Sequence, residues 1–340
     1  MATRLLLAGK ETVSERISRF VPPSCRPPAH HELVWQQRGD LCEYCLDLGA
    51  IEPAASITDP AGLEVLPSFS AQTRAPYGFQ IALEWTESGA VQSVPLSPIG
   101  APIAAFNGDE APNAPVRSLI DYFAIDRPLS RAQIRLRAGP ASSLAGAPCL
   151  LTASVRAPDS AAPATGSSTG RANVDVPALT QMIDPQLGPR LCSPTSVTMV
   201  ISHFGGDADL LEVAHAAYHP AHDLYGVWPA ALYAASRHGL LGYLLRFPDW
   251  ATARWLLEHQ VPIVASIRYG RDQLPGAAVP KTKGHLVVVR GFEGDSVLVN
   301  DPAAPAPSQV PRAYPLESFL QAWLGGSGVG YVLFPGADDG

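Results

Sequence analysis

Short apolar runs recur between turn-forming clusters along the first half of this 340-residue chain. They are bounded by Pro, Gly, Ser and Asp residues, as in HELVWQQR, LCEYCLDLG, YGFQIALEWTE, SLIDYFAID, AQIRLRAG and PCLLTASVRA. Regularly spaced short strands of this kind are typical of an antiparallel sandwich. The pattern predicts an all-β sandwich domain over residues 1–156, with helical spacing only over Glu11 to Phe20.

The pattern changes after residues 157–175, which are rich in Ala, Pro, Ser and Gly and predict a flexible linker. Amphipathic helical spacing follows in CSPTSVTMVISHF, DADLLEVAHAAYH, PAALYAASRHG and PDWATARWLLEHQ. Strand-like runs come only afterwards, in VPIVASIRY, GHLVVVRGF, SVLVNDP and GVGYVLFP. Helices followed by a sheet predict a segregated α+β domain over residues 176–340.

Composition and charge exclude several classes of protein. Hydrophobic residues make up 46% of the chain and charged residues 16%, so a sizeable core can be buried. The net charge is −7 and lysine is scarce, which argues against a nucleic-acid partner. The sequence contains no stretch typical of a membrane span. MATRLLLAGKETVSERISRF lacks the pattern of a signal peptide, so a cytoplasmic location is expected, with export as the alternative.

Five cysteines, an odd number, argue against a disulfide framework. Cys192 precedes Ser193-Pro194 and an apolar helical run that ends at Gly205-Gly206. Proline is favoured in the first turn of a helix and glycine after its end, so Cys192 is expected at a helix N-terminus. The helix dipole and free N–H groups there favour a thiolate. The segment indicates a nucleophile, with an inert buried thiol as the alternative.

A cysteine nucleophile needs a base and a group that orients the base. His285 begins the apolar strand GHLVVVRGF, and Asn300 and Asp301 end the next strand-like run. Antiparallel pairing through the short turn between the two runs brings the residues after Val299 beside the start of the His285 strand. Asp301 is favoured because a carboxylate also stabilises an imidazolium. In the alternative, Asn300 and Asp301 only shape a turn before Pro302.

Acyl transfer also needs hydrogen-bond donors for the developing oxyanion. The backbone N–H of Cys192 is one such donor if the residue begins a helix. Gln181 and Gln186, both upstream of Cys192, each offer a side-chain amide as the second donor.

Six segments together resemble a known family: VPALTQ, CSPTSVTMVISHFGG, LYGVWPAALYAASRHG, VPIVASIRYG, GHLVVVRGF and VNDPA. They are similar to the papain-fold cysteine peptidases related to the bacteriocin-leader-processing endopeptidases, in particular to their stand-alone bacterial branch without a transporter. The resemblance runs from Val174 to about Gly336, and the order and spacing of the motifs carry it. It implies a papain-like cysteine peptidase domain with Cys192 as nucleophile, His285 as general base and later acid, Asp301 as orienting residue and Gln181 as oxyanion donor.

The chain departs from the family pattern at one position and leaves an alternative at another. Ser193 follows the nucleophile where the family often has Gly, and Gln186 is closer than Gln181 to the spacing of papain itself. The implied activity is hydrolysis of a peptide or isopeptide-type amide through a Cys192 thioester, with no metal or organic cofactor. Two alternatives stay open: transfer of the acyl group to an amine, as in a transglutaminase, and a silent papain-fold binding protein.

Two other groups of residues have metal-like spacing. His215 and His219 are four apart near His222, but Ala216 stands where a zincin has Glu, so no zinc site is expected. Cys42-Glu43-Tyr44-Cys45 lies in a predicted strand, where residues three apart point to opposite faces.

The remaining candidates concern binding. Tyr225, Trp228 and Trp250 are expected in the core or at the rim of a substrate cleft, with Trp228 in a loop between Gly226 and Pro229. The sandwich domain carries no catalytic cluster. It is expected to bind a carbohydrate, cell-wall or protein partner, to shield the cleft, or only to pack against the peptidase domain.

Overall fold

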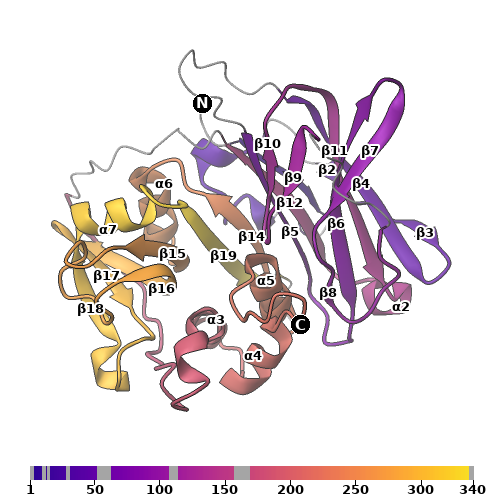
Figure 1. The fold of residues 1–340 in the computed structure, drawn as a ribbon. Coiled ribbons are helices and arrows are strands. Elements are labelled where there is room, and N and C mark those ends of the chain that lie inside the picture. The colour runs from indigo at the N-terminus through magenta and orange to yellow at the C-terminus, as the bar shows by residue number, and fades with distance from the viewer. Residues whose placement is uncertain are drawn as a thin grey trace.

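The computed structural model describes residues 4–9, 13, 16–27, 31–51, 63–106, 114–156 and 169–336. The structure has three sheets, two in the N-terminal half (residues 4–156), whose strands alternate along the chain, and one in the C-terminal half (residues 169–336). Helices cover the C-terminal sheet, whereas the N-terminal half is built almost entirely from strands (Figure 1).

The two N-terminal sheets face each other across one apolar cluster that includes Phe69, Phe79 and Leu136. The first sheet has the order β2-β1-β12-β5-β10-β9. Its strands are β1 (Arg4–Gly9), β2 (His31–Glu32), β5 (Leu63–Ala71), β9 (Val116–Ser118), β10 (Phe123–Ile125) and β12 (Cys149–Arg156). The second has the order β3-β4-β11-β6-β7, with β8 paired to β6. Its strands are β3 (Gln36–Arg38), β4 (Leu41–Ile51), β6 (Gly78–Glu87), β7 (Ala90–Pro95), β8 (Ile99–Gly100) and β11 (Leu129–Gly139). The short segments η1 (Pro23–Cys25) and α2 (Ala141–Leu144) also lie in this half.

Several expected strands differ from the structure. HELVWQQR is divided between β2 and β3, which belong to different sheets, and β2 pairs in parallel with β1. SLIDYFAID is not one strand but a tight hairpin, in which the backbone N–H of Leu119 donates to the carbonyl of Tyr122. The helical pattern over residues 11–20 falls partly outside the described residues.

The C-terminal sheet has the order β14-β19-β15-β16-β17-β18, with β13 paired to β16, and all its pairs are antiparallel. Its strands are β13 (Arg171–Asn173), β14 (Leu240–Arg246), β15 (Ile263–Tyr269), β16 (Thr282–Glu293), β17 (Ser296–Asn300), β18 (Pro311–Pro315) and β19 (Val329–Pro335). Its helices are α3 (Cys192–His203), α4 (Leu210–Ala217), α5 (Trp228–Ser236), α6 (Trp250–Glu258) and α7 (Leu316–Trp323), with 3₁₀ turns η2 (Gly188–Arg190) and η3 (Pro307–Gln309).

The four predicted helices are present, and polar caps explain two of their starts. Asp209 accepts hydrogen bonds from two backbone N–H groups at the start of α4, and Asp249 accepts one at the start of α6. The expected segregation of helices before strands is wrong, because β14 lies between α5 and α6 and α7 lies between β18 and β19. The predicted linker also ends early: residues 171–173 form β13, while residues 157–168 lie outside the described part of the chain.

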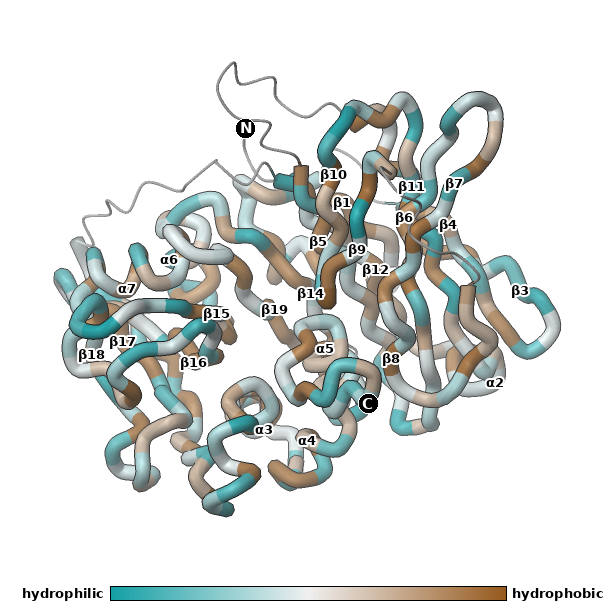
Figure 2. Tube along the Cα trace, viewed as in Figure 1, coloured by the Kyte–Doolittle hydropathy of each residue, from teal (hydrophilic) through white to brown (hydrophobic). Residues whose placement is uncertain are grey.

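The two halves meet where the first N-terminal sheet covers the edge strand β14. Both faces of β5 and β12 are buried, and their even-numbered side chains point away from the second sheet. Ser70, Ser68 and Ser154 accept hydrogen bonds of 3.1, 3.2 and 3.2 Å from the backbone N–H groups of Gly242, Leu244 and Arg246. These serines therefore take the place of a neighbouring strand along the free edge of β14. We call this contact the serine seam; Figure 2 shows the mostly hydrophobic strands β14 and β19 beside it.

The start of the chain also packs on the C-terminal half. The Arg16 guanidinium donates to the carbonyl of Gly336 at 2.9 Å, and Phe20 stacks on Phe334 with ring centroids 4.6 Å apart. The Tyr243 hydroxyl donates to the carbonyl of Phe20 at 2.7 Å. The first and last described segments of the chain thus share one core.

Candidate active site

Cys192 is the first residue of α3, as its sequence neighbours predict. Pro194 occupies the first turn, and the hydroxyl of Thr198 donates to its carbonyl. Cys192 is half-buried, whereas Ser193 beside it is fully buried and lies 3.2 Å from the Tyr331 hydroxyl on β19. The backbone N–H of Cys192 is one of those at a helix start that no carbonyl within the helix can accept.

Hydrogen bonds connect α3, the helix that carries Cys192, to β16, the strand that carries His285. The Ser196 hydroxyl of α3 donates to the carbonyl of Leu286 at 3.3 Å, and the backbone of Leu286 hydrogen-bonds the Cys192 sulfur. His285, the residue before Leu286, lies in β16, is 5% exposed and hydrogen-bonds Cys192 through its side chain.

A β-bulge decides which residue of the next strand faces His285. The pairing register between β16 and β17 shifts by one because β16 carries one extra residue, Arg290. As a result Asn300 pairs with Val288, and the next residue, Asp301, falls on the sheet face that carries His285. Without the bulge, Asn300 would occupy that face.

The carboxylate of Asp301 is fully buried and accepts three hydrogen bonds. His285 Nε2 lies 2.8 Å from its Oδ1, which also accepts the backbone N–H of Ala303 at 3.0 Å. The Tyr314 hydroxyl donates to Oδ2 at 2.6 Å. Because Nε2 is engaged by Asp301, the other ring nitrogen of His285 is the one available to the thiol.

These contacts set the ionisation of the cluster. Burial opposes each charge, but the hydrogen bond and charge of His285 hold the pKa of the Cys192 thiol below its usual value. Asp301 and Cys192 in turn raise the pKa of His285 to about 10 in spite of burial. His285, Tyr314 and Ala303 keep the pKa of the buried Asp301 carboxyl below its ordinary value. The arrangement favours a thiolate–imidazolium pair backed by a carboxylate.

The two candidate glutamines occupy different environments. Gln181 is 2% exposed, and its Nε2 donates to the carbonyl of Gly188 at 2.8 Å in the loop that leads to Cys192. Gln186 is exposed, in a turn in which its backbone N–H donates to Asp184. The second Nε2 proton of Gln181 is not needed for the bond to Gly188. Gln181 is thus buried beside the loop that leads to Cys192, whereas Gln186 is open to solvent.

Sequence reasoning missed Tyr314. It lies on β18, a strand that the sequence pattern does not predict, and its side chain is fully buried against Asp301. The aromatic residue in PRAYP was the available signal, but it gives no indication of which carboxylate the hydroxyl meets.

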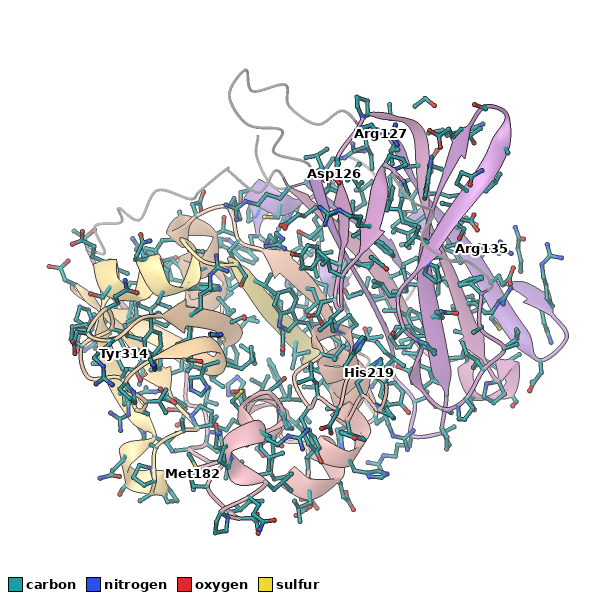
Figure 3. All side chains as sticks on the ribbon, viewed as in Figure 1. Asp126, Arg127, Arg135, Met182, His219 and Tyr314 are labelled. Carbon is teal, nitrogen blue, oxygen red and sulfur yellow. The ribbon has the colours of Figure 1, made fainter. Side chains whose placement is uncertain are left out.

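The other candidate residues lie away from this cluster. His219 is buried at the junction of the two halves, with its ring centroid 4.8 Å from that of His222, whose Nε2 lies 3.2 Å from the Ser97 hydroxyl (Figure 3). His215 is exposed. Within the described residues no group of three or more His, Cys, Asp or Glu side chains is arranged to hold a metal ion. Cys42 is buried and Cys45 exposed, as alternation in a strand predicts.

The aromatic candidates separate into core and rim. Trp250 is 3% exposed and packs in the core. Tyr225 lies under the Arg190 guanidinium, 5.1 Å from its ring centroid. Trp228 is half-buried and stacks on Tyr122 of the N-terminal half, but it begins α5 instead of lying in a loop as expected. No helix in the described part of the chain is long and apolar enough to cross a membrane.

Comparisons with known proteins find a family model and solved structures that are similar to part of this chain. A double glycine motif protease from an AMS/PCAT transporter, solved in complex with the leader peptide, is 20% identical over 50% of this chain and 99% of that chain, with a TM-score of 0.35. A protein described as a C39-like peptidase from Bacillus anthracis is 17% identical over 49% of this chain and 98% of that chain, with a TM-score of 0.39. No curated protein matches the chain. Residues 173–331 match the family model described as Peptidase_C39 like family, which confirms the resemblance that the sequence indicates for the C-terminal half.

Proposed function

We propose that the protein is a cysteine peptidase that cleaves a peptide or isopeptide-type amide at Cys192. The observation that carries this proposal is the buried hydrogen bond of 2.8 Å between His285 Nε2 and Asp301 Oδ1, on an imidazole that also hydrogen-bonds Cys192. Nucleophile, base and orienting group thus form one chain of contacts, the arrangement that covalent catalysis requires. The match of residues 173–331 to a C39-like peptidase family supports the same activity.

In the proposed reaction the Cys192 thiolate attacks the amide carbon and the carbonyl oxygen becomes an oxyanion. The Cys192 backbone N–H and the Gln181 side-chain amide stabilise that oxyanion. When the C–N bond breaks, imidazolium His285 gives its proton to the leaving amine, and a thioester remains. His285 then takes a proton from water, which attacks the thioester and releases the acid and the thiolate. Asp301 orients His285 and stabilises its charged form throughout.

We assign the remainder of the chain to an accessory role. Residues 1–156 are proposed to form the β-sandwich domain that the sequence predicts, and residues 176–340 the papain-like domain. The serine seam and the contact of Phe20 with Phe334 support a fixed arrangement of the two halves, in place of two domains joined only by a flexible linker.

The test is the pH dependence of Cys192 alkylation by iodoacetamide, with the site identified by mass spectrometry. We expect Cys192 to react well below pH 7 in the wild type, because His285 holds the pKa of the thiol below its usual value. In His285→Ala the reaction should rise only near pH 8.5, as for a free thiol. Cys45, the exposed cysteine, is the internal control. Ordinary reactivity of Cys192 in the wild type would contradict the proposal.

A second measurement separates hydrolysis from acyl transfer. Peptide cleavage is followed by mass spectrometry with and without a primary amine such as glycine ethyl ester. Hydrolysis yields the free acid in both cases. An amide product that grows with amine concentration would instead indicate the transglutaminase-like alternative.

A further inference from the structure

The turn between β9 and β10 lies in the N-terminal half but contacts the element that borders the candidate active site. Asp121 Oδ1 accepts the backbone N–H of Trp228, the first residue of α5, at 2.7 Å. Tyr122 stacks on the Trp228 ring, with centroids 6.5 Å apart and an interplanar angle of 13°. The hairpin therefore supplies the side-chain cap that α5 lacks in its own N-cap residue, Val227.

Two charged side chains, Arg246 and Glu64, also hold this turn in place. The Arg246 guanidinium lies 5.0 Å from the centroid of the Tyr122 ring. Arg246 also pairs with Glu64 at 2.6 Å, and Glu64 hydrogen-bonds the Tyr122 side chain. Asp121 and Tyr122, two of the four residues of the turn, are thus held on the C-terminal half.

The other two residues of the turn are apolar and open to solvent. Leu119 is 38% exposed and Ile120 is 41% exposed. Apolar side chains on a tightly anchored turn keep their place without a partner, and their exposure leaves apolar surface to be covered. We call these two side chains, together with the half-buried Trp228 on which the turn packs through Tyr122, the hairpin wall.

Packing of α5 connects the hairpin to the helix of Cys192. Trp228, whose backbone N–H donates to Asp121, begins α5, and α5 packs on both α3 and β19. Next to Cys192 on α3, the Ser193 hydroxyl lies 3.2 Å from the Tyr331 hydroxyl of β19. In Figure 1, α3 lies between β16 on one side and α5 on the other, and the β9–β10 hairpin stands above α5. The hairpin wall therefore lies at the start of α5, and α3 packs on both α5 and β16, the strand of His285.

The direction of the proposed reaction assigns this side to one end of the substrate. His285 protonates the leaving amine, so the amine side of the substrate lies toward β16. The acyl side must then extend from Cys192 in the other direction, toward α5. Resting on the peptidase activity proposed above, we propose that Leu119, Ile120 and Trp228 form a subsite for an apolar side chain on the acyl side of the scissile bond, so that the N-terminal half helps to select the substrate.

The experiment uses tetrapeptide chloromethyl ketones, in which the Cys192 thiolate displaces chloride and forms a thioether. A panel carries Leu or Ser, one position at a time, at the second, third and fourth residues from the ketone. Rates of Cys192 labelling are measured for the full-length wild type, for Leu119→Ser/Ile120→Ser, and for the matched control Val34→Ser, an exposed apolar residue of the same half. Iodoacetamide, which carries no peptide, reports the reactivity of the thiol alone.

We expect one position at which the wild type and Val34→Ser react about ten-fold faster with Leu than with Ser. In Leu119→Ser/Ile120→Ser that ratio should fall to within about two-fold, with the iodoacetamide rate unchanged. A second variant, Asp121→Ala, releases the turn and should lower the same ratio with both apolar residues intact. Absence of a Leu preference in the wild type, or a preference that survives in the double variant, overturns the subsite. An ordinary iodoacetamide profile instead overturns the peptidase proposal, while the Leu-to-Ser ratio still decides the subsite.

Discussion

The serine seam and the candidate active site are both buried polar clusters, but they are built from different groups. The seam uses neutral hydroxyls, and Ser68, Ser70 and Ser154 meet backbone N–H groups of β14. The candidate active site uses ionisable groups, Cys192, His285 and Asp301, which meet one another. Neutral hydroxyls satisfy a strand edge without a pH dependence. A buried network of ionisable groups changes with pH and can move protons.

The two clusters therefore differ in their expected roles. The serine seam holds the two halves together, whereas the ionisable cluster is proposed to carry out the reaction. Damage to the seam should lower stability and leave thiol reactivity intact. Damage to the ionisable cluster should lower reactivity far more than it lowers stability. The predictions below test this separation, beginning with the largest expected effect.

The largest effect is expected from removal of the carboxylate. Asp301→Ala leaves His285 buried without its charged partner, and kcat/KM for peptide cleavage should fall on the order of 10³- to 10⁴-fold. Asp301→Asn retains the shape but not the charge and should lose nearly as much. A loss below ten-fold in both variants would show that Asp301 does not orient the base.

The stability of Asp301→Asn relative to the wild type should depend on pH. The pKa of Asp301 is below its ordinary value of 3.8, so its contribution to stability is present above about pH 4 and lost as the pH falls. The pKa of His285 is raised from 6.5 to about 10, so its contribution is complete below about pH 6.5 and lost as the pH rises toward 10. The Tm difference between wild type and Asp301→Asn should therefore be greatest between about pH 4 and pH 6.5.

The seam should respond in stability alone. Ser70→Val removes a hydroxyl that accepts the Gly242 N–H and donates to the Gly242 carbonyl, both at 3.1 Å, and leaves these groups buried without a partner. The free energy of unfolding should fall by about 1–3 kcal/mol in a denaturant titration. The pH profile of Cys192 alkylation should stay that of the wild type. Ser130→Val, at an exposed serine of β11, is the control.

Tyr314→Phe should give a smaller effect on activity. Loss of a hydrogen bond to a charged carboxylate is worth about 1.5 kcal/mol, or about ten-fold in kcat/KM. The pKa of Asp301 should rise without this donor, and the acid limb of the pH–rate profile should move to higher pH. A fall in Tm without any change in the pH profile would make Tyr314 a packing residue only.

The smallest effect is expected at the junction of the hairpin with α5. Burial raises the pKa of Asp121 to about 7, against the Trp228 N–H and Arg246, which lower it. The folded protein then keeps a proton that the unfolded chain releases, so this residue makes the protein less stable as the pH rises from about 4 to about 7. The Tm of wild type relative to Asp121→Asn should fall over this interval. Asp126→Asn, an exposed carboxylate of the same hairpin, is the control.

Much of the site follows from the sequence because its signals are local. Cys192 before Ser193-Pro194 predicts a helix start, and the structure has α3 begin there. The two strands after residue 284 and the turn between them predict that His285 meets the end of the next strand, as it does. The choice between Asn300 and Asp301 could not be derived from an ideal hairpin. With regular pairing Asn300 would lie on the sheet face that carries His285. The extra residue, Arg290, shifts the register so that Asp301 lies on that face instead.

Strands that are buried on both faces were harder to predict, because alternation between apolar and polar residues does not mark their buried faces. β14 reads LLGYLLR and is buried on both faces, so it shows no alternation that would mark it as a strand. In β5 and β12 the alternating Ser and Thr residues are typical of a solvent-facing surface, yet they are buried against β14. The short strands β13 and β18 have too few apolar residues to be predicted from the sequence pattern. Tyr314 lies on β18, so its role was missed together with the strand.

The contact between the two ends of the chain has a consequence for the order of folding. Arg16 meets a carbonyl 320 residues further along the chain. At a synthesis rate of about 5–20 residues per second, the N-terminal segment waits roughly 15 to 60 seconds before the strand it covers has been made. Contacts so distant in sequence are also slow to form. The N-terminal sheets can assemble early, but the core that supports Cys192 closes only when the last strand, β19, arrives. A competent thiol is therefore among the last features of the newly made chain to appear.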